Sequence, residues 1–160
     1  MPRPTKKRSI LEPPKIRGMK PSGVPARDLE KILLTIDEYE AIRLADDEGL
    51  DHQSAADALG VSRPTFSRLI EQARHKVAQA IVGVKELVIE GGHFNFQTHL
   101  MRCGDCGEFI RIDIPENHPD NCSYCHSQNL ENWNESFMHG RGKGFGKGHG
   151  GHGHGNGRNR

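Results

Sequence analysis

Four cysteines carry the clearest chemistry in this 160-residue chain, because they form two C-x-x-C pairs. Cys103 and Cys106 make the first pair, and Cys122 and Cys125 make the second pair fifteen residues later. Two such pairs at this spacing are typical of a structural zinc site, in which each pair forms a tight turn and supplies two thiolates. The sequence therefore predicts a four-thiolate metal site at these cysteines.

Zinc is the predicted metal, with iron as an alternative. Iron in a rubredoxin-like site uses the same four ligands, and an iron–sulfur cluster is a further candidate. A catalytic zinc is not expected, because four thiolates leave no open position for water. His118 and His126 lie near the cysteines in sequence. They are interpreted as surface residues rather than ligands.

A second chemical feature is the helix-turn-helix pattern of residues 53–70. Ala56 supplies the small residue needed where two helices touch, and Gly60 stands at the turn position that favours positive φ. Apolar residues occupy the positions expected between the two helices, namely Ala55, Leu59, Val61, Phe66 and Leu69. Ser62 then begins the recognition helix, whose first side chains are expected to face the bases of the major groove.

Five polar side chains of this helix are the predicted DNA contacts. They are Arg63, Thr65, Ser67, Arg68 and Arg74. Arginine pairs with guanine or with phosphate, and threonine and serine can do either. Arg74 lies further along the helix, so it is expected to contact the DNA backbone. The alternative interpretation is a helical hairpin that packs against another protein.

Capping residues predict the helices that position these side chains. Thr35 and Glu38 form a capping box before an apolar stripe, so a helix begins there and ends near Gly49. A second helix follows an Asp51 cap and ends at Gly60. The third helix begins after Ser62 and runs to about Val82.

The remaining ordered segments are short. Those that fit a strand are 27–34, 86–90, 93–100 and 109–114. The first of these fits a helical turn equally well, and the third fits a linker. Periodicity does not separate these alternatives in segments of this length.

Charge is strongly segregated along the chain, although the net charge is only +1. Residues 1–27 hold eight lysines or arginines and one acid, whereas 28–60 hold ten acids and two basic residues. Residues 61–102 are mildly basic, 103–135 are acidic, and 136–160 contain no acid. A basic arm and a basic helix around an acidic body indicate surfaces that face a polyanion.

The glycine-rich tail adds a weaker metal-binding feature. From Gly140 onward the chain holds only glycine, histidine, lysine, arginine and asparagine, apart from Phe145. This composition cannot form a core and predicts disorder. His149, His152 and His154 could bind nickel, zinc or copper weakly. The alternative is a solubilising tail.

Three stretches resemble one family of small prokaryotic proteins. They are GVP at 23–25, LLTIDEYEAIRLAD at 33–46 and GVSRPTFSR at 60–68, and the beginning MPRP and the ending IEGG at 89–92 fit too. The family is domain-of-unknown-function family 134, and the resemblance covers roughly the first 95 residues. Its helix-turn-helix is similar to the C-terminal DNA-binding region of bacterial primary sigma factors. The resemblance therefore implies a DNA-binding role in transcription.

These features predict a mainly α protein. Its expected parts are a helix-turn-helix domain similar to the sigma-factor C-terminal region, a small β zinc ribbon and disordered tails. The predicted divisions are a basic proline-rich arm at 1–26, the helix-turn-helix domain at 27–92, the four-cysteine module at 93–135 and the tail at 136–160. The arm is expected to be extended, because it has few apolar side chains.

The predicted function is a DNA-binding transcriptional regulator that reads the major groove with the helix beginning at Ser62. The alternatives are an adaptor that contacts RNA polymerase, and a metal-responsive regulator that uses the ribbon or the tail. Double-stranded DNA is the expected partner, and a homodimer is a further expectation. A cytoplasmic location is predicted, because no apolar stretch is long enough to span a bilayer. No enzyme is predicted, because the sequence offers no nucleophile–base pair, phosphate loop or open metal site.

Overall fold

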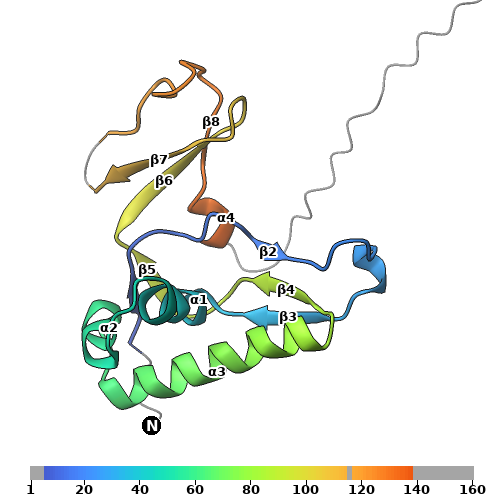
Figure 1. The fold of residues 1–160 in the computed structure, drawn as a ribbon. Helices are drawn as coiled ribbons and strands as arrows, with labels where there is room; N and C mark the ends of the chain where they lie inside the picture. Colours follow the sequence, from blue (N-terminus) through green and yellow to red (C-terminus); the bar gives the residue numbers. More distant parts are fainter. Residues whose placement is uncertain (1–5, 115–116, 139–160) are drawn as a thin grey trace, which may run out of the picture.

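A computed structural model describes residues 6–114 and 117–138 (Figure 1). The helical elements are η1 (Ala26–Asp28), α1 (Ile36–Ile42), η2 (Arg43–Asp47), α2 (His52–Leu59), α3 (Arg63–Val82) and α4 (Glu135–Met138). The strands are β1 (Arg8–Ile10), β2 (Gly18–Met19), β3 (Lys31–Leu34), β4 (Glu86–Ile89), β5 (Phe94–Phe96), β6 (Thr98–Cys103), β7 (Phe109–Asp113) and β8 (Leu130–Asn132). The predicted weak metal ligands of the tail lie outside the described residues; they are His149, His152 and His154.

The fold is mixed α/β, so the prediction of a mainly α protein was wrong. Helix makes up 36% and strand 23% of the described residues, and these strands form three small sheets. Strands β1, β2 and β8 were not predicted, because they are only two or three residues long and pair with distant segments. Strand β3 runs parallel to β4, and β1 runs parallel to β5. A long segment of chain connects the two strands of each pair. Local periodicity carries no information about such pairing.

The central sheet has the order β2-β4-β3, and α3 lies along it. Strand β3 is parallel to β4, with Leu33 opposite Val88, and β2 runs antiparallel to β4. The connection from β3 to β4 contains α1, η2, α2 and α3, which supplies the long crossover that a parallel pair needs. The predicted strand at 86–90 is therefore confirmed as β4, and 27–34 contains both η1 and β3.

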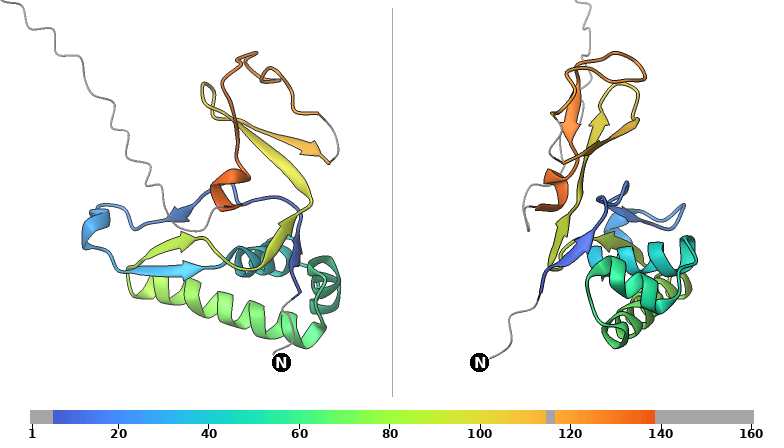
Figure 2. Two further views of the ribbon diagram at one scale, coloured as in Figure 1. Left: turned by 180° about the vertical axis from the view of Figure 1, so that it is seen from behind. Right: turned by 90° about the vertical axis from the view of Figure 1, so that its left-hand side faces the viewer.

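The third sheet, β7-β6-β8, is antiparallel and carries the cysteines. Figure 2 shows it standing away from the helices, on the side of the molecule opposite α3. The predicted strand at 109–114 is confirmed as β7, and 93–100 contains β5 and the beginning of β6.

Two apolar clusters hold the helical part together. One lies among α1, α2 and the first half of α3, and its buried members are Ala41, Leu44, Ala55, Ala56, Leu59, Phe66, Leu69 and Ile70. The other lies between α3 and the central sheet, and its buried members are Ile10, Leu34, Ile36, Ala73, Ala80, Leu87, Ile89 and Phe137. The predicted apolar positions of the helix-turn-helix all lie in or against the first cluster. The second cluster contains residues from both ends of the described chain.

The capping residues act as predicted. The Thr35 amide donates to Glu38 at 2.9 Å within a complete capping box, and Asp51 accepts from the first amides of α2. Gly60 ends α2 at φ +72, where an L side chain would be strained. Ser62 caps α3, which ends at Val82. The predicted boundaries of α2 and α3 are thus confirmed, whereas the first predicted helix begins as expected but consists of α1, which ends at Ile42, and η2, which ends at Asp47.

From residue 6 onward, where the structure describes it, the N-terminal segment differs from the expected extended arm. Strand β1 pairs with β5, and Ile10 is fully buried in the cluster beneath α3. Arg8 forms an ion pair at 2.8 Å with the buried carboxylate of Asp37. These contacts stabilise a proline-rich stretch whose composition alone predicts no fixed structure.

The described helices were also compared with the requirements of a membrane span. Within residues 6–114 and 117–138, every helix falls short of the length and apolarity that crossing a bilayer requires.

Candidate metal centre and nucleic-acid interface

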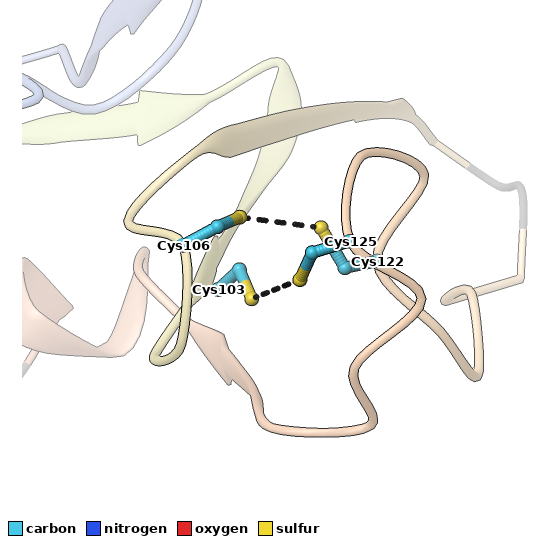
Figure 3. Close-up of side chains that lie close together, drawn as sticks. All are labelled: Cys103, Cys106, Cys122 and Cys125. Atoms are coloured by element: carbon cyan, nitrogen blue, oxygen red, sulfur yellow. Dashed lines mark hydrogen bonds between the residues drawn. The ribbon is translucent and has the colours of Figure 1, made fainter.

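The four cysteine sulfurs lie together between the two loops of the ribbon (Figure 3). All four Sγ atoms are within 4.8 Å of one another. The Cys103–Cys125 and Cys106–Cys122 Sγ atoms are each separated by 3.6 Å. A tetrahedral site with Zn–S bonds of about 2.3 Å has sulfur–sulfur edges of about 3.8 Å. The donor set and its dimensions therefore fit a tetrahedral metal ion.

The two C-x-x-C loops have the same backbone structure. The amide of Gly107 donates to the carbonyl of Cys103 at 2.9 Å, and the amide of His126 donates to the carbonyl of Cys122 at 2.9 Å. Gly107 has φ +78 and His126 has φ +62. His126 thus ends the second loop with a left-handed backbone conformation, which histidine tolerates better than most residues. Sequence analysis did not detect this backbone role.

A polar network joins the two loops. The carboxylate of Asp105 accepts from the hydroxyl of Ser127 and from the Asn129 side-chain amide, the latter at 3.0 Å. These two donors hold the pKa of Asp105 below its usual value. Asn129 lies so close to Gly104 that a Cβ at that glycine would clash with it. The glycine therefore allows the network to close behind the sulfurs.

The cysteine thiols of the cluster differ in pKa. The backbone amide of Cys106, with help from that of Asp105, outweighs burial and lowers the pKa of the Cys103 thiol to about 6. The amide of Glu108 lowers the pKa of Cys106, but burial and the neighbouring sulfurs outweigh it and raise that pKa to about 12. Four thiolates this close repel one another, so a cation is required to keep all four deprotonated.

The histidines near the cysteines take no part in this cluster. Within the part of the chain that the structure describes, the four cysteines are the group of at least three metal-ligating side chains that gather at one point. His118 and His126 are exposed, and the His118 ring packs edge-on against His99 at 5.1 Å.

The second site is the first half of α3. The steep packing of α2 on α3 uses fully buried Ala56, as the sequence predicts. Figure 1 places α3 along the edge of the molecule that faces away from the ribbon. Arg63, Thr65 and Arg68 are exposed there, whereas Ser67 is half-buried.

Residues 1–97 match the family described as "Protein of unknown function DUF134". The match covers more than half of the chain. The chain belongs to the DUF134 family. The family segment includes the whole first apolar cluster and every buried member of the second except Phe137, and it ends before the first cysteine pair.

Relatives extend the similarity beyond the DUF134 segment. A "UPF0251 protein" of Chloroherpeton thalassium is 50% identical over 144 residues, which are 88% of this chain and 95% of that protein. A "UPF0251 protein" of Halothermothrix orenii is 40% identical over 125 residues, which are 78% of this chain and 93% of that protein. No solved structure matches this DUF134 chain.

Two of the predicted DNA contacts have partners within this DUF134 chain. Arg74 donates to both carboxylate oxygens of Asp46, at 2.6 and 3.1 Å, and this hydrogen bonding, aided by the charge of Arg74, holds the pKa of Asp46 below the usual value. Ser67 bonds through Oγ to Nδ1 of His52 at 2.9 Å. His52, for which the neighbouring sequence offers no partner, is therefore held against the beginning of α3. The half-buried His52 ring also packs against the ring of Phe66 in α3, a contact that no local sequence pattern indicates.

Three buried acids form another feature that sequence analysis missed. Asp37, Glu38 and Glu40 are each less than 5% exposed, although acidic side chains are rarely buried unless paired. Glu38 accepts from Lys76 Nζ at 2.7 and 2.8 Å, which fixes α1 against the middle of α3. Arg43 binds both carboxylate oxygens of Glu40, at 2.7 and 2.8 Å. Glu38 therefore holds α1 against α3, and Glu40 holds the side chain of Arg43.

Proposed function

We propose that this DUF134 protein is a DNA-binding transcriptional regulator whose α3 enters the major groove. One observation carries the proposal. Helices α2 and α3 pack through Ala56 and a left-handed Gly60 turn, and this packing leaves the first turns of α3 uncovered. This is the arrangement in which a recognition helix presents its N-terminal side chains to base edges.

The ion pairs of α3 support the same conclusion. Arg74 and Lys76, further along the helix, are bound to Asp46 and Glu38. Arg63 and Arg68 form no ion pair within residues 6–114 and 117–138, and both are exposed. The fold therefore neutralises the distal cations of α3 and leaves its N-terminal cations for a ligand. A groove lined by phosphates and guanine edges is the ligand that such arginines fit best.

Replacing Arg63 or Arg68 with alanine is expected to weaken specific DNA binding. A base contact is worth about 1–3 kcal/mol, which is about 5- to 150-fold in affinity. The target would first be selected from genomic fragments of the source organism, and affinity then measured by fluorescence anisotropy at two salt concentrations. An equal loss on target and scrambled DNA would assign the arginine to phosphate.

Arg27→Ala is the matched control, because this arginine is 84% exposed on η1, far from the beginning of α3. It is expected to leave affinity unchanged. The proposal fails if no motif survives moderate salt, or if the control loses as much affinity as the α3 variants. Co-purification with RNA polymerase under those conditions would favour the adaptor.

A second candidate is the metal-responsive form of this regulator, and the path of the chain after Cys125 favours it. Trp133 donates through Nε1 to the carbonyl of Pro14 at 2.7 Å. Phe137, only 8% exposed, lies in the same apolar cluster as Ala73 and Ala80 of α3. The segment that leaves the metal centre thus ends in the core that supports the recognition helix.

On this second candidate, chelation is expected to weaken DNA binding by about 5- to 150-fold, the usual range of coupling between two sites. The Phe137→Ala variant should mimic chelation and lose most of the further response to it. Affinity of the zinc-loaded protein would be measured before and after chelation, with a parallel readout of ribbon unfolding. Unchanged affinity in a chain whose ribbon has unfolded would exclude a metal switch and leave the first proposal intact.

A further inference from the structure

The fold divides the basic residues at the beginning of the chain between two parts of the molecule. Residues 1–27 hold eight lysines or arginines, which composition alone treats as one basic arm. In the structure, β1 contacts α1 and α2, whereas β2 pairs with β4. Lys6 and Lys7 immediately precede β1, and Lys15 and Lys20 lie on either side of β2. The two pairs of lysines therefore have different surroundings.

Strand β1 is fixed beside the helix-turn-helix. The Arg8 side chain binds the carboxylate of Asp37, at the beginning of α1, at 2.8 Å, and Ile10 is fully buried. In Figures 1 and 2, the dark blue beginning of the described chain lies at the end of the molecule where α3 begins. As the neighbours of Arg8 in the chain, Lys6 and Lys7 therefore lie at the same end of the molecule as the first turn of α3.

Lys6 and Lys7 are cations that the fold leaves unused. Both are exposed, and neither forms an ion pair among the residues that the structure describes. Arg8 differs, because the buried carboxylate of Asp37 neutralises it. No acid precedes Glu12 in the sequence. An ammonium group is a compact charge that suits a phosphate, whereas arginine is the side chain that recognises a guanine edge with two parallel hydrogen bonds.

We propose that Lys6 and Lys7 bind DNA phosphates beside the groove that α3 enters, an inference that rests on the proposed DNA-binding function. The beginning of α3 carries the exposed Arg63 and Arg68. A helix in the major groove lies between two phosphate backbones, so cations at this end of the molecule meet the backbone that borders the groove. Contacts of this kind position a protein on DNA and carry no sequence preference.

Lys15 and Lys20 do not take part in this contact. Lys20 lines a groove between β2 and the last turns of α3, and the 20 residues of this helix span about 30 Å. Lys15 follows Pro14, whose carbonyl accepts from the indole of Trp133 in the segment after the ribbon. Both lysines are exposed and are without an ion pair in the described part of the chain. They match the first pair in residue type, charge and exposure, but not in place.

The salt dependence of DNA binding tests the phosphate contact. The affinity of the full, zinc-loaded chain for its selected target and for scrambled DNA would be measured between about 50 and 200 mM salt. In Lys6→Ala with Lys7→Ala, the slope of log affinity against log salt should fall in magnitude by about 1.8, because each phosphate contact contributes about 0.9. Affinity at the lowest salt should fall about tenfold or more on both DNAs, so that their ratio stays the same.

Two further variants separate the charge of these lysines from their place. Lys6→Arg with Lys7→Arg keeps both charges and should retain the slope. Lys15→Ala with Lys20→Ala removes the same charge elsewhere and should leave the slope and the affinity almost unchanged. Because all four lysines are exposed, each variant should keep the melting temperature of the parent chain, which checks that it is folded.

Equal losses of slope in the two alanine double variants would overturn the proposal, because net charge rather than the place of the lysines would then govern binding. An unchanged slope in Lys6→Ala with Lys7→Ala would also overturn it, and a selected motif that depends on Arg63 or Arg68 would keep the regulator proposal intact. If no motif is selected, a smaller slope on scrambled DNA in that variant alone would support the lysine contact while the regulator proposal fails.

Discussion

Removal of the metal is expected to unfold the cysteine ribbon while α1, α2 and α3 stay folded. The ribbon buries few apolar side chains, namely Leu100, Met101 and Ile112 besides Cys103 and Cys122. A small sheet with this core cannot offset its own ordering entropy. A structural zinc ion contributes about 10–16 kcal/mol of apparent free energy at neutral pH, so its loss outweighs every other interaction in the module.

Two readouts follow the unfolding. Trp133 is the only tryptophan of the chain and packs against Phe109 of β7, with ring centroids 5.5 Å apart, so its fluorescence reports on the ribbon. Amide hydrogen exchange of β6 and β7 gives the second readout, with α3 as the internal reference. Cys103→Ser should reproduce the effect of chelation, and Ser123→Ala, an exposed change inside the second loop, should not. Full exchange protection of β7 after chelation would contradict a structural metal.

Lowering the pH is expected to release the metal from the four cysteine ligands. Protons compete with the metal for the thiolates, so affinity falls as the pH falls. The amides that lower the pKa of Cys103 to about 6 keep this sulfur available to the metal at neutral pH. Metal release is therefore expected on acidification, as protons displace the metal from the thiolates.

The second large effect is expected at Lys76. Its Nζ lies 2.7 and 2.8 Å from the two carboxylate oxygens of Glu38, which is 3% exposed. Lys76→Met would leave a buried carboxylate without its cation, and breaking such a pair costs about 3–5 kcal/mol. The Thr35 amide also binds this carboxylate, so part of the capping box would loosen too. Urea unfolding monitored by far-UV circular dichroism measures the change.

Two comparisons isolate the cause. In Glu38→Gln with Lys76→Met neither charge remains, so most of the stability should return, and the cycle of single and double variants gives the coupling energy. Lys85→Met breaks the pair with Glu30, which is 79% exposed, and should leave the free energy of unfolding almost unchanged, because solvent screens this pair. A loss as small as this in Lys76→Met would show that solvent reaches Glu38 and that the pair does not fix α1 on α3.

Sequence alone predicted the features that depend on local chemistry. Asp51, Gly60 and Ser62 act within a few residues of their own positions, so the bounds of α2 and α3 followed from residue type. The clustering of the cysteines followed from the pairing of two short motifs. The identity of the metal and the DNA contacts remain predictions.

Features that depend on distant contacts could not be predicted in this way. Lys76 meets its partner Glu38 from 38 positions away, and Trp133 meets the carbonyl of Pro14 from 119 positions away. Phe137 lies in the core beneath α3, although position 137 was assigned to a disordered tail. The mainly α prediction failed for the same reason, because short strands become recognisable only through their partners.

The pairing of β1 with β5 has a consequence for synthesis of the chain on the ribosome. Arg8 of β1 lies opposite Phe94 of β5, so its partner strand is made 86 residues later. At about 5–20 residues per second in cells, several seconds pass before β5 emerges. During that interval Ile10 has no closed core to enter, whereas α2 and α3 can form from contiguous sequence. The residues of β1 are thus expected to reach their native positions only after β5 has been synthesised.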